Sequence, residues 1–171
     1  MNFYRVIDNS KLHDFGDPIG QIPIMGKMLK EIQEDYVAEI GGRLIDISSE
    51  AIISDENYFV FSEVLFFTRD FLKKAIKASM HSKNSLRFCF SRNTFNERYV
   101  LPHPIDTETH HIFEFRYQCG GDIQNQVMEQ KVFENGMRLP NQIVAEGNYS
   151  MDQCETYAIH IISPFHLLFA N

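Results

Sequence analysis

The run Tyr58–Phe61, which reads Tyr-Phe-Val-Phe, constrains the fold of this chain more than any other feature. Four consecutive aromatic or β-branched residues without polar alternation are typical of a strand that is buried on both faces. A polar break at residues 54–57 precedes this run. An interior strand requires other elements to be packed on its sheet. We therefore predict an α/β fold with a mixed sheet covered by helices, and α+β is the alternative.

Two helices flank this strand in the sequence pattern. Between residues 25 and 40 apolar residues recur every three or four positions, and Gly41-Gly42 follows where a left-handed helix end is wanted. A short strand is expected next, at Arg43–Ile47. A second helix is expected to start after Thr68, which can cap it, and to end near His81. The expected buried stripes are Met25, Met28, Leu29, Ile32, Tyr36 and Ile40 in the first helix, and Phe71, Leu72, Ala75, Ile76 and Met80 in the second.

The second half of the chain is rich in predicted strands. Hydrophobic patterning predicts them at residues 86–90, 112–117, 127–133 and 156–162. Asn135-Gly136 fits a tight hairpin, because both residues tolerate positive φ. Pro164 suits the first turn of a short helix from Phe165 to Ala170. We expect this half to be mostly antiparallel.

The charge of the chain limits its partners. Sixteen Lys and Arg residues against 23 Asp and Glu residues give a net charge of −7, so a basic surface for non-specific nucleic-acid binding is not expected. A local basic pocket for a small phosphorylated ligand stays open. Its candidate residues are Arg43, Arg69, Arg87, Arg92 and Arg98.

Cysteine usage and hydropathy suggest a compartment. The three cysteines, Cys89, Cys119 and Cys154, form no CxxC pair, which argues against a disulfide framework and a structural zinc site. No apolar run approaches the roughly 20 residues of a membrane helix, and residues 1–5 lack the apolar character of a signal peptide. We expect a soluble cytoplasmic protein that binds neither nucleic acid nor a membrane.

Residues 61–67, Phe-Ser-Glu-Val-Leu-Phe-Phe, are the most informative stretch for function. They place Glu63 just past the predicted interior strand and before the second helix. In open α/β sheets, ligands bind at the carboxyl ends of the strands. A carboxylate there, beside a phosphate, can hold Mg²⁺ through one or two oxygens. Glu63 is therefore the candidate catalytic and Mg²⁺-binding residue, and the alternative is a solvent-facing glutamate in a strand-to-helix loop.

Two segments resemble sugar-phosphate nucleotidyltransferases. Residues 22–29, Ile-Pro-Ile-Met-Gly-Lys-Met-Leu, look like the segment in which a Leu-Pro-Val-like strand leads through Gly into a helix. Residues 62–66, Ser-Glu-Val-Leu-Phe, are similar to the family's Gly-Asp-x-Leu-Phe element, whose Asp binds the catalytic metal. The resemblance implies that Glu63 replaces that Asp, and that the fold is nucleotide-diphospho-sugar transferase-like.

The resemblance also implies a ligand, a nucleotide or a sugar phosphate bound at this edge, with Mg²⁺ as cofactor. Lys27, Arg43 and Arg69 are the candidate substrate-binding residues, which would orient phosphates. The family's Gly-rich phosphate loop is missing, because residues 9–18 contain only Gly16. Nucleotidyl transfer by the family's in-line mechanism is therefore in question. The alternative function is a non-catalytic assembly or accessory domain.

Residues 163–171, Ser-Pro-Phe-His-Leu-Leu-Phe-Ala-Asn, resemble the short helix that leads into a left-handed parallel β-helix in two-domain bacterial sugar nucleotidyltransferases. The resemblance implies a single nucleotidyltransferase-like domain at residues 1–163 and a connector at residues 164–171 to a C-terminal β-helix domain. Two other interpretations stay open. The helix docks on a second subunit of a homo-oligomer, or it closes its own core.

A third functional hypothesis is a metal-binding domain, because His103, Asp106, His110 and His111 form a dense set of potential ligands. The alternative is a solvated loop, since prolines at 102 and 104 mark a loop and no HExxH helix pattern is present. Cys89 lies in a predicted strand rich in aromatic residues and is expected to be a core residue rather than a nucleophile.

Overall fold

A six-stranded mixed sheet organises the chain. The computed structural model describes residues 1–7, 16, 18–92, 107–120, 128–133, 156–162 and 166. Its elements are β1 (Asn2–Ile7), the 3₁₀ helix η1 (Ile19–Gln21), β2 (Pro23–Ile24), β3 (Lys27–Met28), α1 (Leu29–Glu39), β4 (Arg43–Ser48), β5 (Asn57–Ser62), β6 (Leu65–Phe67), α2 (Arg69–Ser79), β7 (Ser85–Ser91), β8 (His110–Cys119), β9 (Met128–Phe133) and β10 (Ala158–His160). The Asn135-Gly136 turn, Cys154 and the predicted helix at 165–170, apart from His166, lie outside the described residues.

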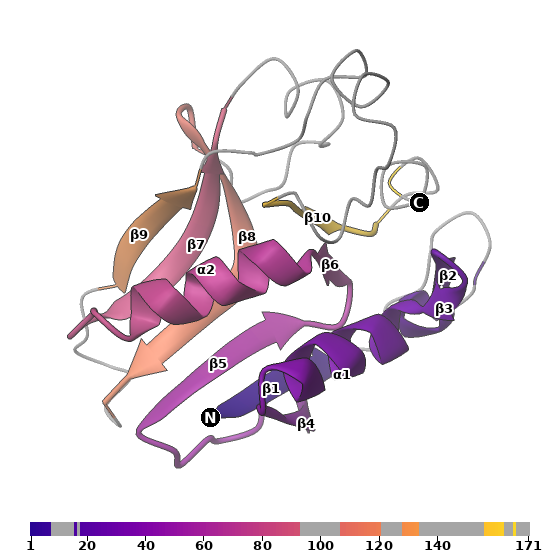
Figure 1. Cartoon of the computed structure of the whole chain (residues 1–171), viewed down its shortest axis with the longest axis horizontal. Helices are drawn as coiled ribbons and strands as arrows, with labels where there is room; N and C mark the ends of the chain where they lie inside the picture. The colour runs from indigo at the N-terminus through magenta and orange to yellow at the C-terminus, as the bar shows by residue number, and fades with distance from the viewer. Residues whose placement is uncertain are drawn as a thin grey trace.

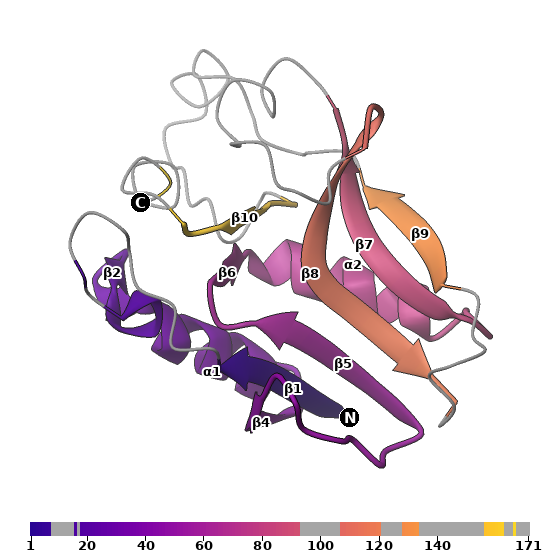
Figure 2. The ribbon, with the colours of Figure 1, turned by 180° about the vertical axis from the view of Figure 1, so that it is seen from behind.

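The strand order of the large sheet is β4-β1-β5-β8-β7-β9. Strands β4, β1 and β5 are parallel, whereas β8 runs antiparallel to both β5 and β7. Both helices lie in front of the sheet in Figure 1 and behind it in Figure 2, so they cover the same face. The predicted mixed α/β sheet is confirmed. The expected antiparallel pairing holds for β8, while β9 pairs parallel with β7.

Helix α1 begins at Leu29, four positions later than the periodicity predicts. Met25 and Gly26 adopt φ values of 50° and 78°, which are left-handed and incompatible with a helix. They form instead the turn of a hairpin between β2 and β3. The helix starts where the Glu31 carboxylate accepts a hydrogen bond from the Met28 N–H at 2.9 Å. Met25 and Met28 are consequently 40% exposed, so their predicted burial is wrong.

The end of α1 follows the sequence pattern. Gly41 has a φ of +70° and ends the helix as predicted. Gly42 is needed for a different reason, since a Cβ there would lie 2.7 Å from the Phe3 ring and 2.8 Å from Val37. This close approach packs the end of α1 against β1 before the chain enters β4.

Strand β5 lies inside the sheet between β1 and β8, as predicted. Its residues from Tyr58 onward are all buried. Phe59 and Phe61 point to the helix side, where rings from six elements form the core. The aromatic members of this core include Phe3, Phe59, Phe61, Phe67, Phe71, Phe88, Phe90 and Phe115.

Helix α2 also begins as predicted. The Thr68 hydroxyl accepts a hydrogen bond from the Phe71 N–H, and Asp70 lies in the first turn. The helix ends at Ser79, and Met80 is 71% exposed, so its predicted burial is wrong. No helix in the described part of the chain is long and apolar enough to cross a membrane.

Asp70 connects α2 to the segment that enters β10. Its carboxylate accepts hydrogen bonds from the Thr156 hydroxyl and from Lys74 Nζ. Burial raises the pKa of Asp70, but these two hydrogen bonds, together with the positive charges of Lys74 and Lys73, outweigh burial and leave its pKa below the ordinary value. The bonds therefore stabilise the fold above the pKa of the unfolded chain, and this stabilisation is lost as pH falls through the lower folded pKa.

Asp70→Asn is expected to lower the free energy of unfolding by about 1 kcal/mol at pH 7. The difference from the wild type should shrink when urea unfolding is repeated at pH 3, because the wild-type carboxyl group becomes protonated. Asp35→Asn is the matched control, since its ion pair with Lys27 is half exposed. An equal loss at both pH values would contradict a role for the Asp70 charge.

Candidate functional site

Three parallel strands end at one edge of the sheet. These strands are β1, β4 and β5, which end at Ile7, Ser48 and Ser62. Glu63 follows β5 directly, and its backbone N–H donates to the Val6 carbonyl at 3.0 Å. The structure thus places Glu63 at the carboxyl edge of the parallel strands, where open α/β sheets bind ligands.

A buried polar network fixes the turn that carries Glu63. Gln33 of α1 is 1% exposed, and its Nε2 donates to the Glu63 carbonyl at 3.2 Å and to the Leu65 carbonyl at 2.8 Å. Its Oε1 accepts from Arg5 Nη1 at 3.1 Å. Arg5, on β1, is held in turn by Asp46 of β4 at 2.8 Å. The position of Glu63 therefore depends on β1, β4 and α1 together.

The Glu63 side chain is turned toward η1. The residue is 8% exposed, so the alternative of a solvent-facing glutamate is wrong. Its Oε2 lies 3.7 Å from where a Cβ on Gly20 would be. Gly20 belongs to the segment that returns to α1 after β1. Glu63 is thus held between the carboxyl end of β5 and the entry to α1.

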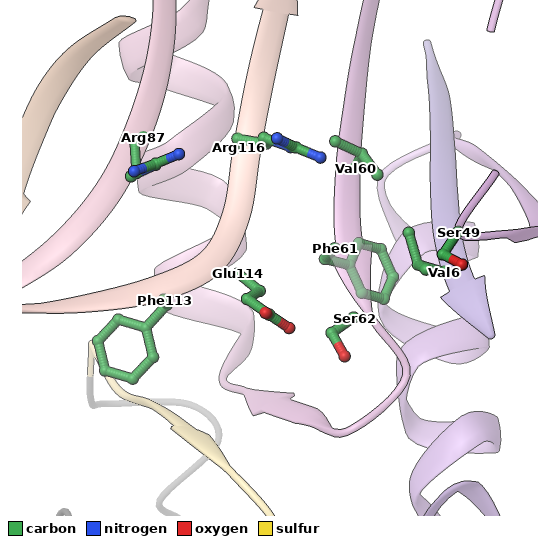
Figure 3. A pocket seen from close by; sticks show the side chains of 9 residues that line it. All are labelled: Val6, Ser49, Val60, Phe61, Ser62, Arg87, Phe113, Glu114 and Arg116. Carbon is green, nitrogen blue, oxygen red and sulfur yellow. The ribbon is translucent and has the colours of Figure 1, made fainter. Parts of the chain in front are cut away.

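A cavity of about 390 Å³ opens at the same edge, where Val60 and Arg116, paired across β5 and β8, lie on the face of the sheet opposite the aromatic core. We call it the edge cavity (Figure 3). Its described lining residues are Val6, Ser49, Val60, Phe61, Ser62, Arg87, Phe113, Glu114 and Arg116. Ser62 lines the cavity, whereas the next residue, Glu63, is not among the lining residues. Glu63 therefore directly follows a lining residue in the sequence, but its side chain lies on a different side of the end of β5 from the edge cavity.

The charged groups of the edge cavity come from the antiparallel strands. Arg87 of β7 and Arg116 of β8 are directly opposite in the strand register. Burial raises the pKa of the nearby Tyr58 hydroxyl, and the Arg116 charge partly opposes that rise. Glu114 is the acidic residue among the described lining residues.

The predicted substrate-binding residues are not brought to this cavity. Lys27 lies on β3 and pairs with Asp35 at 2.5 Å. Arg69 pairs with Glu39 at 2.7 Å and stacks on Tyr36 with 4.4 Å from its guanidinium carbon to the ring centroid.

Arg43 lies at the far end of the sheet. It begins β4, at the amino end of a strand whose carboxyl end borders the edge cavity. Of the five arginines proposed for a basic pocket, Arg87 lies in the edge cavity, and Arg98 lies outside the described residues. Arg116 was missed, because its sequence neighbours show only that it alternates with buried residues. Only the strand register shows that it lies opposite Arg87.

The structure describes only part of the predicted metal-binding loop. His103 and Asp106 lie outside the described residues. His110 and His111 begin strand β8 rather than lying in a loop, and the described residues contain no group of three or more acidic, His or Cys side chains that could hold a metal ion. Cys89 is fully buried, as expected for a core residue, and burial raises the pKa of its thiol to about 11. A thiol with this pKa is a poor nucleophile near neutral pH.

Comparison with known proteins finds similarity in structure alone. No protein-family model matches the chain, and no curated protein matches its sequence. HddC from Yersinia pseudotuberculosis in complex with GMP-PN superimposes with a TM-score of 0.53 and 13% identity, covering 99% of this chain and 97% of HddC.

Two further solved structures are similar. A proposed glucose-1-phosphate thymidylyltransferase from Bacillus anthracis has a TM-score of 0.53 and 8% identity, over 99% of this chain and 93% of that chain. The inositol-1-phosphate CTP transferase from T. maritima has a TM-score of 0.51 and 11% identity, over 99% of this chain and 95% of that chain. At such identities the likeness is one of fold.

Proposed function

From a nucleotide-diphospho-sugar transferase-like fold, we propose that the chain binds a nucleotide or a sugar phosphate at the carboxyl edge of β1, β4 and β5. The observation that carries this proposal is that the edge cavity opens at the carboxyl ends of β4 and β5, where Ser49 and Ser62 line it. Ligand pockets of small molecules commonly have volumes of roughly 300–1,000 Å³. A cavity of about 390 Å³ is within that range.

The edge combines polar and apolar groups suited to such a ligand. Ser49 and Ser62 present hydroxyl groups, and Val6, Val60 and Phe113 present apolar surface. A sugar or a base needs both kinds of contact, because its ring faces are apolar and its substituents form hydrogen bonds. The similar proteins are named for complexes or reactions of this class, which agrees with the proposal.

Glu63 fits Mg²⁺ only when a ligand brings further oxygens. It is a single carboxylate, and the described residues form no cluster of metal ligands around it. Mg²⁺ in nucleotide sites is commonly held by one or two carboxylates together with substrate phosphates. We propose that Glu63 is the protein ligand of an Mg²⁺ ion that enters with the phosphates. Bound there, the ion would neutralise phosphate charge.

The test is thermal unfolding with Mg²⁺ and nucleoside triphosphates, with and without sugar 1-phosphates. At a ligand concentration 100-fold above Kd, the Tm of the wild type is expected to rise by roughly 5–10 °C, because only the folded chain binds. Glu63→Gln should remove the part of this rise that requires Mg²⁺. Glu56→Gln, an exposed change at the amino end of β5, is the matched control and should behave like the wild type.

A wild type whose Tm responds to none of these ligands would overturn the proposal and favour the assembly or accessory domain. An unchanged Mg²⁺ response in Glu63→Gln would leave ligand binding in place and remove Glu63 from the metal site. Ligand binding does not by itself predict nucleotidyl transfer, because residues 9–18 hold one glycine where nucleotidyl transfer uses a Gly-rich loop.

A further inference from the structure

Two arginines lie opposite each other on neighbouring strands at the edge cavity. Arg87 of β7 and Arg116 of β8 are register partners in an antiparallel pair. Side chains directly opposite in such a pair have Cβ atoms about 5 Å apart and lie on the same face of the sheet. The neighbouring Phe88 and Phe115 are fully buried on the helix side, so the two arginines extend from the opposite face (Figure 3). Both guanidinium groups therefore belong to the wall of one hollow.

This arrangement is unfavourable without an anion. Like charges directly opposite on paired strands destabilise a sheet. Among the described residues, neither guanidinium has a hydrogen-bond or ion-pair partner. A compensating negative group is therefore missing from the described part of the wall.

Glu114 does not supply that compensation. It lines the same cavity, but its carboxylate makes no ion pair with either arginine in the described structure. The basic side chain recorded beside it is that of His160, whose Nε2 lies 4.0 Å from Glu114 Oε2. The same Nε2 accepts a hydrogen bond from the Glu114 backbone N–H at 3.2 Å. The described lining is thus locally cationic in a chain whose net charge is −7.

The geometry points to a phosphate-binding pair: we propose that Arg87 and Arg116 bind the phosphate group of a sugar-sized phosphate monoester in the edge cavity. This inference rests on the proposed function and names the residues and the ligand class. Guanidinium groups match phosphate oxygens with two parallel N–H donors each, and two of them balance a dianion. In this arrangement we expect the sugar to contact Val6, Val60 and Phe113 and to hydrogen-bond with the Ser49 and Ser62 hydroxyls, since all five residues line the same cavity.

The experiment measures binding of glucose 1-phosphate, inorganic phosphate and unphosphorylated glucose by calorimetry. Wild type is expected to bind both phosphates, with glucose much weaker. Arg87→Gln and Arg116→Gln should each weaken phosphate binding about tenfold, and the double variant about a hundredfold. The phosphate affinity of Arg87→Lys should lie between those of the wild type and Arg87→Gln, because lysine keeps the charge and loses the paired N–H donors of the guanidinium. Lys83→Gln removes one exposed charge just before β7 and should bind like the wild type.

A second measurement separates lost binding from lost folding. Without ligand, the double variant is expected to have a Tm at or above that of the wild type, since its cross-strand repulsion is gone. Wild-type affinity for glucose 1-phosphate in a folded double variant would overturn the arginine pair and leave the proposed function standing. If wild type binds neither a phosphate nor a nucleotide, the pair and the proposed function both fail.

Discussion

Phe115→Ala is expected to lower the free energy of unfolding by about 3–5 kcal/mol, the largest effect of any single substitution considered for this chain. Phe115 of β8 is fully buried at the centre of the aromatic core. Its ring centroid lies 5.1 to 5.7 Å from those of five other rings, Phe59, Phe61, Phe67, Phe71 and Phe88. Removing the ring leaves a cavity that rigid neighbouring rings cannot fill, and it also removes edge-to-face contacts.

Urea unfolding followed by circular dichroism measures this loss. Phe115→Leu is the matched comparison, because it keeps most of the apolar volume and should lose much less. Met80→Ala is the surface control. It should leave the free energy of unfolding nearly unchanged, because the Met80 side chain is largely in solvent. A loss below about 1 kcal/mol for Phe115→Ala would contradict the central place of this ring.

Arg5→Met is expected to cost about 3 kcal/mol and to disturb the ligand edge as well. Arg5 is 2% exposed, and burial disfavours its charge, but hydrogen bonds to Asp46 and Glu34 outweigh that effect and raise the pKa of the guanidinium. It also donates to the Lys30 carbonyl at 3.0 Å and to Gln33 Oε1 at 3.1 Å. A methionine fills similar space but leaves these buried acceptors without their donor.

The functional part of this prediction is specific. Because Gln33 holds the carbonyls of Glu63 and Leu65, Arg5→Met should weaken the Mg²⁺-dependent nucleotide response in folded protein. Arg5→Lys keeps the charge without the planar fork and should show an intermediate stability loss. Calorimetry and urea unfolding on the same samples separate the two effects. Unchanged stability in Arg5→Met would show that the network contributes little.

Local sequence patterns predicted the elements whose signals lie within a few residues. Each of four features depends on near neighbours along the chain, so the sequence predicted them. They are the buried run of β5, the Thr68 cap, the left-handed helix end at Gly41 and the glutamate after β5. The same periodicity misplaced the start of α1, since the hydrophobic pattern does not register the left-handed backbone at Met25 and Gly26.

The site was harder to predict than the elements. Lys27, Arg43 and Arg69 were chosen as cations near family-like motifs, and the structure holds Lys27 and Arg69 in ion pairs elsewhere and Arg43 at the amino end of β4. Arg116 gave no local signal. Arg116 is 29 residues from Arg87 in the sequence, and only the pairing of β7 with β8 brings the two residues opposite each other.

The sequence by itself determined the α/β class and placed Glu63 at a strand end, because strand burial and helix caps are local properties of the chain. The tertiary structure decided which charges meet. Strand order and register bring Arg87 and Arg116 to one cavity and connect Arg5 through Gln33 to the Glu63 turn. Such contacts depend on the packing of distant segments, for which a hydrophobic pattern carries no information about partner or register.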